Sequence, residues 1–232
     1  MAASIWRKFE PFRDAARSAQ RGAHLEKKRF RTSEQNRPQV QERRDAFVAM
    51  MAKEDPSRLI FIDESGCNVA MASTHGRAPS GARVYDHKPA NWGENLSIVG
   101  AVRSDRVLCH QTFVGAINGP RFVEFVRSRL CRRLYPGDVV VLDNLRPHHA
   151  PVVRELVEAQ GAKLVFLPPY SPDFSPIEPC WSFVKYHLRR LAHRTAHALR
   201  RAIRHVFMRV RSDHLRNWFA HCGYPQSERS PV

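Results

Sequence analysis

The sequence predicts an α/β domain in which helices flank a central mixed sheet, preceded by a short helical or irregular N-terminal segment. Five short apolar runs have the character of buried strands, and segments with helical periodicity follow the third run, the fourth and the last. Hydrophobic residues make up 43% and charged residues 26% of the 232 residues. This composition is typical of a chain that buries one globular core, and it excludes disorder throughout the chain.

The elements follow in a simple order. The first 57 residues are polar and rich in arginine and glutamine, with helical stretches such as Gln39 to Lys53, and we expect a basic remnant or linker there. The strand-like runs lie at 59–62, 96–102, 107–114, 139–142 and 164–167. Gly119 and Pro120 open a helical segment after the third run, and residues 151–159 form a second one after the fourth. The predicted order is three strands, helix, strand, helix, strand, and then helices.

Two amphipathic helices follow the last strand. The apolar stripe of the first consists of Trp181, Val184, Leu188 and Leu191. The stripe of the second consists of Leu199, Ile203, Val206, Phe207 and Val210. We attribute both stripes to core packing, with the arginines on the opposite faces in solvent. Residues 225–232 are expected to be a flexible tail.

The positive charge is concentrated near the ends of the chain. The formal net charge is +16, and residues 181–232 carry 11 basic but only two acidic side chains. DNA is the expected partner, because basic side chains neutralise phosphates and release counterions. The alternative is a solvated basic surface without a partner. The arginines that we expect to bind DNA are Arg189, Arg190, Arg200, Arg201 and Arg204.

Other features of the sequence limit the class of protein. The five cysteines include no CxxC pair, so neither a disulfide framework nor a zinc site is indicated. No apolar run approaches the roughly 18 residues of a membrane helix. The N-terminus also lacks the apolar stretch of a signal peptide. We therefore expect a cytoplasmic protein without a membrane partner.

Three acidic residues lie where an α/β domain could bring them together. Asp63 follows the first apolar run, and Asp143 follows the fourth. If the two strands are neighbours, both carboxylates project from the same end of the sheet. Glu178 lies at the start of the Trp181 helix, whose N-terminus favours an ionised carboxylate. Oxygen ligands alone select magnesium or manganese rather than zinc.

Several strings in the sequence resemble those of a known enzyme family. They are FIDESG, GRAPSGARV at 76–84, ING at 117–119, VVVLDN with the following His148, and LPPYSPDFSPIE at 167–178. They are similar to the catalytic domain of DDE transposases of the mariner-like superfamily, specifically its bacterial insertion sequence 630 branch. The resemblance runs from about Arg58 to about Tyr224. The 34 residues between Asp143 and Glu178 match the spacing of that branch.

The resemblance implies an RNase H-like catalytic domain over residues 58–224 that cleaves DNA strands and transfers them. Asp63, Asp143 and Glu178 would hold two Mg²⁺ or Mn²⁺ ions at the scissile phosphate. Asn144 and His148 also match the family strings and could orient water, metal ligands or DNA. The partners would be the element ends and target DNA at a TA dinucleotide. The protein would act as a homo-oligomer on DNA, in the cytoplasm of a bacterium and on its nucleoid.

Other residues of chemical interest have simpler interpretations. Glu64 is expected to point to the opposite face of the strand from Asp63, in a structural role. Asp173 is expected to form a turn. His193 and His197 have the spacing of a metal pair but lie among arginines, so we expect a solvated face. Trp92 is expected to be a core or loop-anchoring residue rather than a base-stacking one.

The N-terminal segment leaves two interpretations open. Members of the family normally begin with helix-turn-helix modules much longer than the 57 residues found here. A truncated copy and the downstream product of two reading frames joined by frameshifting are both compatible with this start. The alternative function is therefore a decayed, catalytically silent DNA-binding fragment. The transposase strings disfavour a third hypothesis, a structure-selective RNase H-like nuclease.

Overall fold

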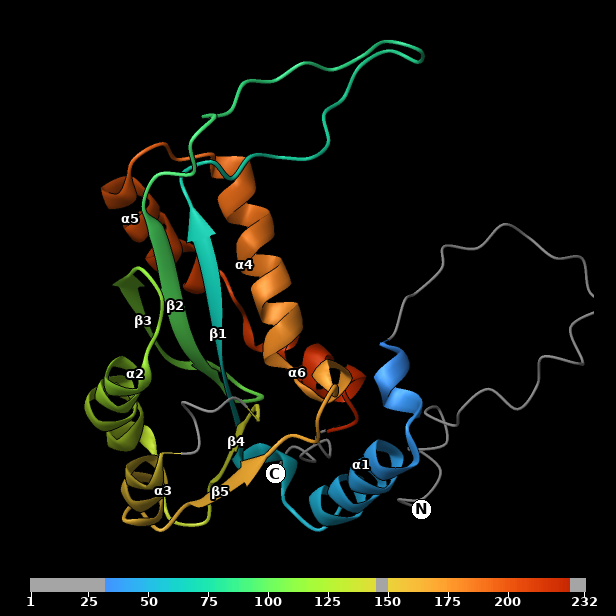
Figure 1. Ribbon diagram of the computed structural model, residues 1–232, viewed down its shortest axis with the longest axis vertical. Helices are drawn as coiled ribbons and strands as arrows, with labels where there is room; N and C mark the ends of the chain where they lie inside the picture. Colours follow the sequence, from blue (N-terminus) through green and yellow to red (C-terminus); the bar gives the residue numbers. More distant parts are fainter. Residues whose placement is uncertain (1–31, 145–149, 226–232) are drawn as a thin grey trace, which may run out of the picture.

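A five-stranded sheet forms the centre of the molecule, as a computed structural model of the chain shows (Figure 1). The structure describes residues 32–144 and 150–225. The strands are β1 (Leu59–Asn68), β2 (Asn95–Val102), β3 (Val107–Val114), β4 (Val139–Leu142) and β5 (Lys163–Phe166). Their order across the sheet is β3-β2-β1-β4-β5. All five strands coincide with predicted apolar runs, because each run is long enough to cross a buried sheet.

The sheet is mixed, as predicted. β1 pairs with β2 and β2 with β3 in antiparallel fashion, whereas β4 lies parallel to both β1 and β5. β1 continues past its apolar run to Asn68, so Asp63 lies inside the strand and not at its end, which corrects the prediction. The strand continues because Ser65 and Cys67, which are buried, alternate with more exposed neighbours and still pair with β2. In this register Asp63 lies opposite Gly100.

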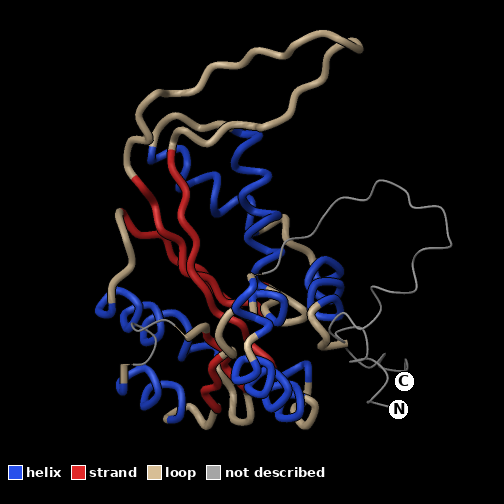
Figure 2. The backbone as a smooth tube through the Cα atoms, turned by 45° about the vertical axis from the view of Figure 1, so that its right-hand side comes forward, coloured by secondary structure: helices blue, strands red, loops and turns tan. Residues whose placement is uncertain are grey.

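Helices cover both faces of the sheet (Figure 2). They are α1 (Pro38–Met51), α2 (Gly119–Phe125), α3 (Pro151–Glu158), α4 (Ile177–Leu191), α5 (Ala196–Phe207) and α6 (Ser212–His221). A π-helical turn, η5 (Val126–Leu130), and a 3-10 turn, η6 (Cys131–Arg133), extend α2. The sequence did not predict α6, a short helix that packs Phe219 edge-on against Phe61 of β1 at 5.5 Å between ring centroids. Leu191, expected in the stripe of α4, is exposed at the end of that helix.

The two faces of the sheet belong to two separate hydrophobic clusters. Side chains alternate across a strand, so Val140 joins one cluster and Val141 the other. α2, η5 and α3 close one cluster, while α1, α4, α5 and α6 close the other. The strands in the middle are therefore buried on both faces, which explains why their sequences are continuous apolar runs.

Helix α1 belongs to the same core as the sheet. Its Phe47 and Met51 are buried in the cluster formed by α4, α5 and α6, and Phe47 stacks on Phe174 with 5.6 Å between ring centroids. Part of the segment expected to be a remnant or linker before residue 58 thus packs as an element of the domain. Residues 1–31 and 226–232, which include most of the expected flexible tail, lie outside the described residues.

A long loop joins β1 to β2. Residues 69–94 contain neither helix nor strand and project from one end of the molecule (Figure 1). The GRAPSGARV string lies in this loop, as does Trp92, which is 68% exposed and therefore neither a core nor an anchoring residue. Among the residues described, no helix is both long enough and apolar enough to span a membrane.

Candidate active site

The three predicted acids come from three different elements. Asp63 lies inside β1, Asp143 directly follows β4, and Glu178 is the second residue of α4. β1 and β4 are parallel neighbours, with Phe61 opposite Val141, so Asp63 and Asp143 both lie two residues beyond this pair. Glu178 lies in the first turn of α4, where the partial positive charge of the helix favours a carboxylate.

The pKa values of Asp63 and Glu178 reflect the negative charge of nearby carboxylates. Burial raises the pKa of Asp63 to about 7, and the negative charges of Glu178 and Asp143 contribute to the rise. Burial also raises the pKa of Glu178, and the charge of Asp143 adds to this effect, while Lys185 opposes it. Within residues 32–144 and 150–225, however, no three His, Cys, Asp or Glu side chains already converge as a group that could hold a metal ion.

Trp181 positions Asp63, a role that the sequence did not reveal. Its indole Nε1 donates a hydrogen bond to Asp63 Oδ2 at 2.8 Å, so one carboxylate oxygen is held in place. Gly100, opposite Asp63 on β2, leaves room for the ring, because a Cβ there would lie 2.9 Å from Trp181 Cη2. The apolar stripe of α4 predicted that Trp181 is a core residue, and the residue is indeed only 3% exposed. Its N–H nevertheless donates a hydrogen bond to Asp63.

The segment before Glu178 is fixed by α1. Arg44 of α1 donates to Ser171 Oγ at 2.7 Å and forms an ion pair with Asp173 at 2.6 Å. The Arg44 guanidinium also lies 4.2 Å from the centre of the Phe174 ring. Asp173 lies in a short 3-10 turn, in agreement with the expected turn-forming role. The tertiary structure adds a second role, because the ion pair ties this turn to α1.

The remaining candidates are more dispersed. Asn144 directly follows Asp143 and is exposed, whereas His148 lies outside the described residues. Glu64 lies beside Asp63 on a strand that does continue, as expected for a side chain of the opposite face. His193 lies after α4 and His197 lies inside α5, so the two do not share a helix face.

The five predicted DNA-binding arginines divide into groups. Arg189 and Arg190 lie in the last turn of α4, where Arg190 donates to the Tyr186 hydroxyl at 3.1 Å. Arg200 and Arg204 of α5 line one groove beside β3. Arg201 lies on α5 outside the lining of that groove, and like the other four it is exposed.

Comparisons with known proteins agree with this arrangement. The model of the DDE superfamily endonuclease family matches residues 58–200. Two structures of Mos1 transposase, a paired-end complex with the left transposon end and a mariner paired-end complex with Mg, both match at a TM-score of 0.69 and 16% identity. In both cases the match covers 88% of this chain and 64% of the Mos1 chain, so this chain spans less than two thirds of those proteins.

The catalytic domain of Mos1 mariner transposase taken alone matches with a TM-score of 0.55 and 14% identity, over 80% of this chain and 88% of that domain. No curated protein matches the chain. The mixed five-stranded sheet with flanking helices is the RNase H-like fold of that catalytic domain, as predicted. Since the family model matches well over half of the sequence and includes all three acids, the chain belongs to the DDE superfamily of endonucleases.

Proposed function

We propose that this chain is the catalytic part of a transposase of the insertion sequence 630 branch of the mariner-like superfamily. It would cleave DNA strands at the ends of an element and join the freed 3′ ends to target DNA. The observation that carries this proposal is the placement of the three acids in a chain of the DDE endonuclease family: Asp63 and Asp143 lie at matching positions of neighbouring parallel strands, and the charges of Glu178 and Asp143 add to the burial that raises the pKa of Asp63. The insertion sequence 630 assignment rests on the Tyr170–Asp173 string and on the spacing between Asp143 and Glu178.

The donor set fits hard divalent cations. The three acids offer only oxygen ligands, which suit Mg²⁺ or Mn²⁺. Burial first, and then the charges of Glu178 and Asp143, raise the pKa of Asp63 to about 7, so a bound cation would stabilise its ionised form. Asp63, Asp143 and Glu178 would therefore hold two Mg²⁺ or Mn²⁺ ions. Such ions supply a Lewis acid that activates water or a DNA 3′-hydroxyl and stabilises the leaving oxygen.

The chain's own residues would orient the reaction. Trp181 holds Oδ2 of Asp63, and the backbone of Glu64 also donates a hydrogen bond to this carboxylate, so its orientation is fixed. The ammonium group of Lys185 stabilises the ionised form of Glu178. Asn144, and His148 outside the described residues, would orient water or DNA near Asp143.

The partners would be DNA and further copies of the chain. Arg189, Arg190 and Arg201 are proposed to bind phosphates together with Arg200 and Arg204. The DNA would be an element end or target DNA, held by an oligomer in the bacterial cytoplasm. One of the similar Mos1 structures is a complex with a transposon end, which supports DNA as the ligand.

The test is strand cleavage by the purified chain in the presence of Mg²⁺ or Mn²⁺, followed as nicking of plasmid DNA and as joining of a labelled 3′ end. Asp143→Asn should reduce cleavage by at least about a thousandfold, because it removes a charge that holds the cations. Asp45→Asn is the matched control, because Asp45 is an exposed aspartate on α1. The control should cleave like the unmodified chain.

Two results would contradict the proposal. Full activity of Asp143→Asn would exclude Asp143 from the catalytic site. DNA binding without any cleavage by the unmodified chain would favour the alternative, a catalytically silent DNA-binding fragment.

A further inference from the structure

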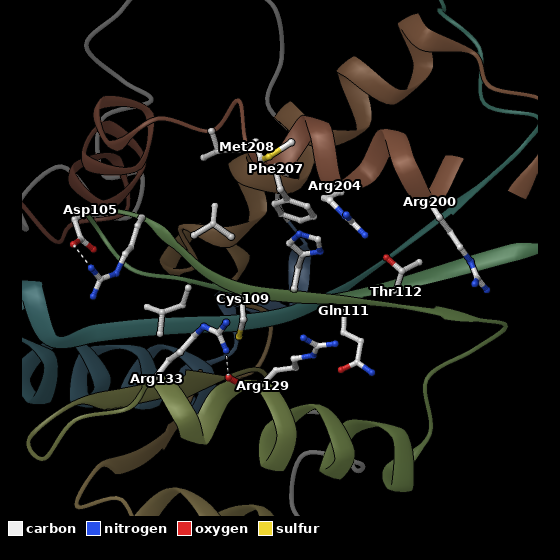
Figure 3. Close-up of a pocket in the computed structure, with 15 residues that line it drawn as sticks. Asp105, Cys109, Gln111, Thr112, Arg129, Arg133, Arg200, Arg204, Phe207 and Met208 are labelled. Atoms are coloured by element: carbon white, nitrogen blue, oxygen red, sulfur yellow. Dashed lines mark hydrogen bonds and ion pairs between the residues drawn. The ribbon is translucent and has the colours of Figure 1, made fainter. Parts of the chain in front are cut away.

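A groove of about 830 Å³ lies along the outer edge of β3 (Figure 3). Its walls are formed by η5 and η6 on one side and by α5 on the other, and none of the three carboxylates lines it. β3 is the outermost strand and lies two strands away from β1. At about 4.8 Å between strands, the groove is therefore about 10 Å or more from Asp63.

Arginines from both walls converge on this groove. Arg129 and Arg133 approach β3 from one side, and Arg200 and Arg204 approach it from the other (Figure 3). Arg200 and Arg204 are four residues apart on α5, which corresponds to about 6 Å along the helix axis, while Arg129 and Arg133 lie in the turns η5 and η6. None of the four forms an ion pair with an acidic side chain of the described residues. We call these four residues the groove arginines.

The groove holds other positive charge and little negative charge. Arg106 also lines it, and the single acid of the lining, Asp105, already lies 3.7 Å from Arg106. The arginine charges reach the floor, because Arg204 and Arg129 contribute to lowering the pKa of His110, after burial as the main cause. The groove is thus a site of strong positive potential that the fold leaves uncompensated.

The edge of β3 adds hydrogen-bonding capacity. An outermost strand presents alternate backbone N–H and C=O groups that the sheet does not pair. Among the described side chains, His110 Nδ1 and Gln111 Oε1 are buried without a hydrogen-bond partner, and both residues line the groove. The backbone N–H groups of β3, and His110 Nδ1 when it carries the ring hydrogen, therefore offer donors in the floor, whereas Gln111 Oε1 can only accept.

These features select a ligand with several regularly spaced negative charges. A free phosphate would engage one or two guanidinium groups, whereas a phosphodiester backbone offers successive phosphates to both pairs. We propose that the groove binds the phosphodiester backbone of DNA at a position separate from the three carboxylates. The choice of DNA over an acidic peptide rests on the proposed function and on the net charge of +16. Different phosphates of one DNA would then occupy the groove and the candidate active site.

The experiment compares two variants that lose the same charge. The groove variant replaces Arg129, Arg133, Arg200 and Arg204 by Gln. The control variant replaces Arg127, Arg132, Arg209 and Arg216 by Gln; these are exposed arginines that neither line the groove nor belong to the proposed phosphate-binding set. Binding of a random-sequence duplex and of a single-stranded oligonucleotide is measured by fluorescence anisotropy over a series of salt concentrations. EDTA is present throughout, so that cleavage plays no part.

The groove variant should lose at least about tenfold more affinity than the control. Its salt slope should fall by about 0.9 for each phosphate that the missing arginines no longer neutralise. The nucleic acid with the larger loss of affinity identifies the bound form. Thermal melting shows whether each variant is folded. In the unmodified chain, DNA should also slow hydrogen exchange of the β3 amides, a measurement that needs no substitution.

Equal losses of affinity in the two variants would overturn the proposal, because the arginines would then act only through the overall charge. Unchanged exchange of the β3 amides in the presence of DNA would also overturn it. Protection of β3 by a polyglutamate peptide but not by DNA would assign the groove to a protein partner instead. Absence of cleavage with intact groove binding would contradict the proposed function alone.

Discussion

The carboxylate site and the β3 groove are opposite versions of one arrangement. Each gathers like charges around a buried titratable group, and in each the pKa of that group moves in the direction that favours its neutral form. Burial and two acids raise the pKa of Asp63 to about 7, while burial and two arginines lower the pKa of His110 to about 4. A ligand of opposite charge would reduce the repulsion among like charges at each site. This ligand would be a cation at the carboxylate site and a polyanion in the groove.

The two regions differ in how firmly their charges are held. Two of the three acids are short side chains set in or directly after strands, and Trp181 fixes one oxygen of Asp63. The groove arginines are long, exposed side chains on helical segments. Short, fixed carboxylates suit chemistry that depends on accurate positions, whereas long guanidinium groups can follow a flexible backbone. On the proposed function, the first region would carry the reaction and the second would hold the DNA.

Aromatic rings separate the two regions. Phe207 of α5 stacks on His110 with 4.3 Å between ring centroids, and it meets the edge of Trp181 at 5.9 Å. Trp181 in turn donates to Asp63. The rings of Phe207 and Trp181 therefore lie between the groove and the candidate active site. Substitutions in one region can be made without removing charged side chains from the other.

The largest expected effect in these comparisons is on stability without metal. The pKa of Asp63 rises from its ordinary value of 3.8 to about 7 in the folded chain. Folding therefore favours the protonated acid, and this contribution to stability is lost as the pH rises through this interval. Asp63→Asn removes the effect while keeping an oxygen for Trp181. Above pH 7 in EDTA, the variant should be more stable than the unmodified chain by at most about 4 kcal/mol.

Urea unfolding over a pH series measures this difference, which should vanish at pH values below the ordinary pKa of aspartate. Asp45→Asn, on the exposed side of α1, should show no such pH dependence. A variant of Asp63 that is less stable than the unmodified chain at every pH would show that the carboxylate is compensated by the fold.

A smaller effect is expected when the hydrogen bond to Asp63 is removed. Trp181→Phe keeps a ring in the core but loses the N–H, and hydrogen bonds to charged groups contribute about 1.5–3 kcal/mol. Metal-dependent cleavage should fall by on the order of tenfold. The pKa of Asp63, followed by NMR in EDTA, should rise further, since this hydrogen bond lowers it. A purely structural role would not move that pKa.

Trp218→Phe provides the matched control, because Trp218 packs against Phe183 and His214 on α4 and α6. Its loss should leave the Asp63 pKa unchanged. Equal falls in cleavage for the two tryptophan variants, with no change in the Asp63 pKa, would reduce Trp181 to a packing residue.

The smallest expected effect is in the groove. Arg204→Gln should raise the pKa of His110, because the Arg204 charge is one cause of its low value. The rise should be modest, since burial is the larger cause and remains. NMR titration of the imidazole measures it. Arg201 lies on the same helix but outside the groove lining, so Arg201→Gln should leave the His110 pKa unchanged. An equal pKa shift in both variants would show that the groove arginines have no special electrostatic effect on His110.

The strands and their order along the chain were predictable from the sequence, whereas the catalytic role of the three acids stays a prediction. Strands of a doubly covered sheet must be apolar on both faces, so they appear as continuous runs such as 139–142. Asp143 stands out because a charge directly after such a run is costly to bury without a partner. α6 was missed because its two buried residues, Leu215 and Phe219, make too short a pattern.

What the sequence determined by itself was local: which segments alternate or repeat, where charge interrupts them, and which family their strings resemble. The contacts that define the two regions are not local. Trp181 and Asp63 are 118 residues apart, and Arg44 and Asp173 are 129 apart. The groove arginines come from segments on opposite sides of β3, and the two pairs lie far apart in the sequence. Only the order of the strands and the packing of helices on both faces bring such residues together, because periodicity specifies which face is buried but not what is packed against it.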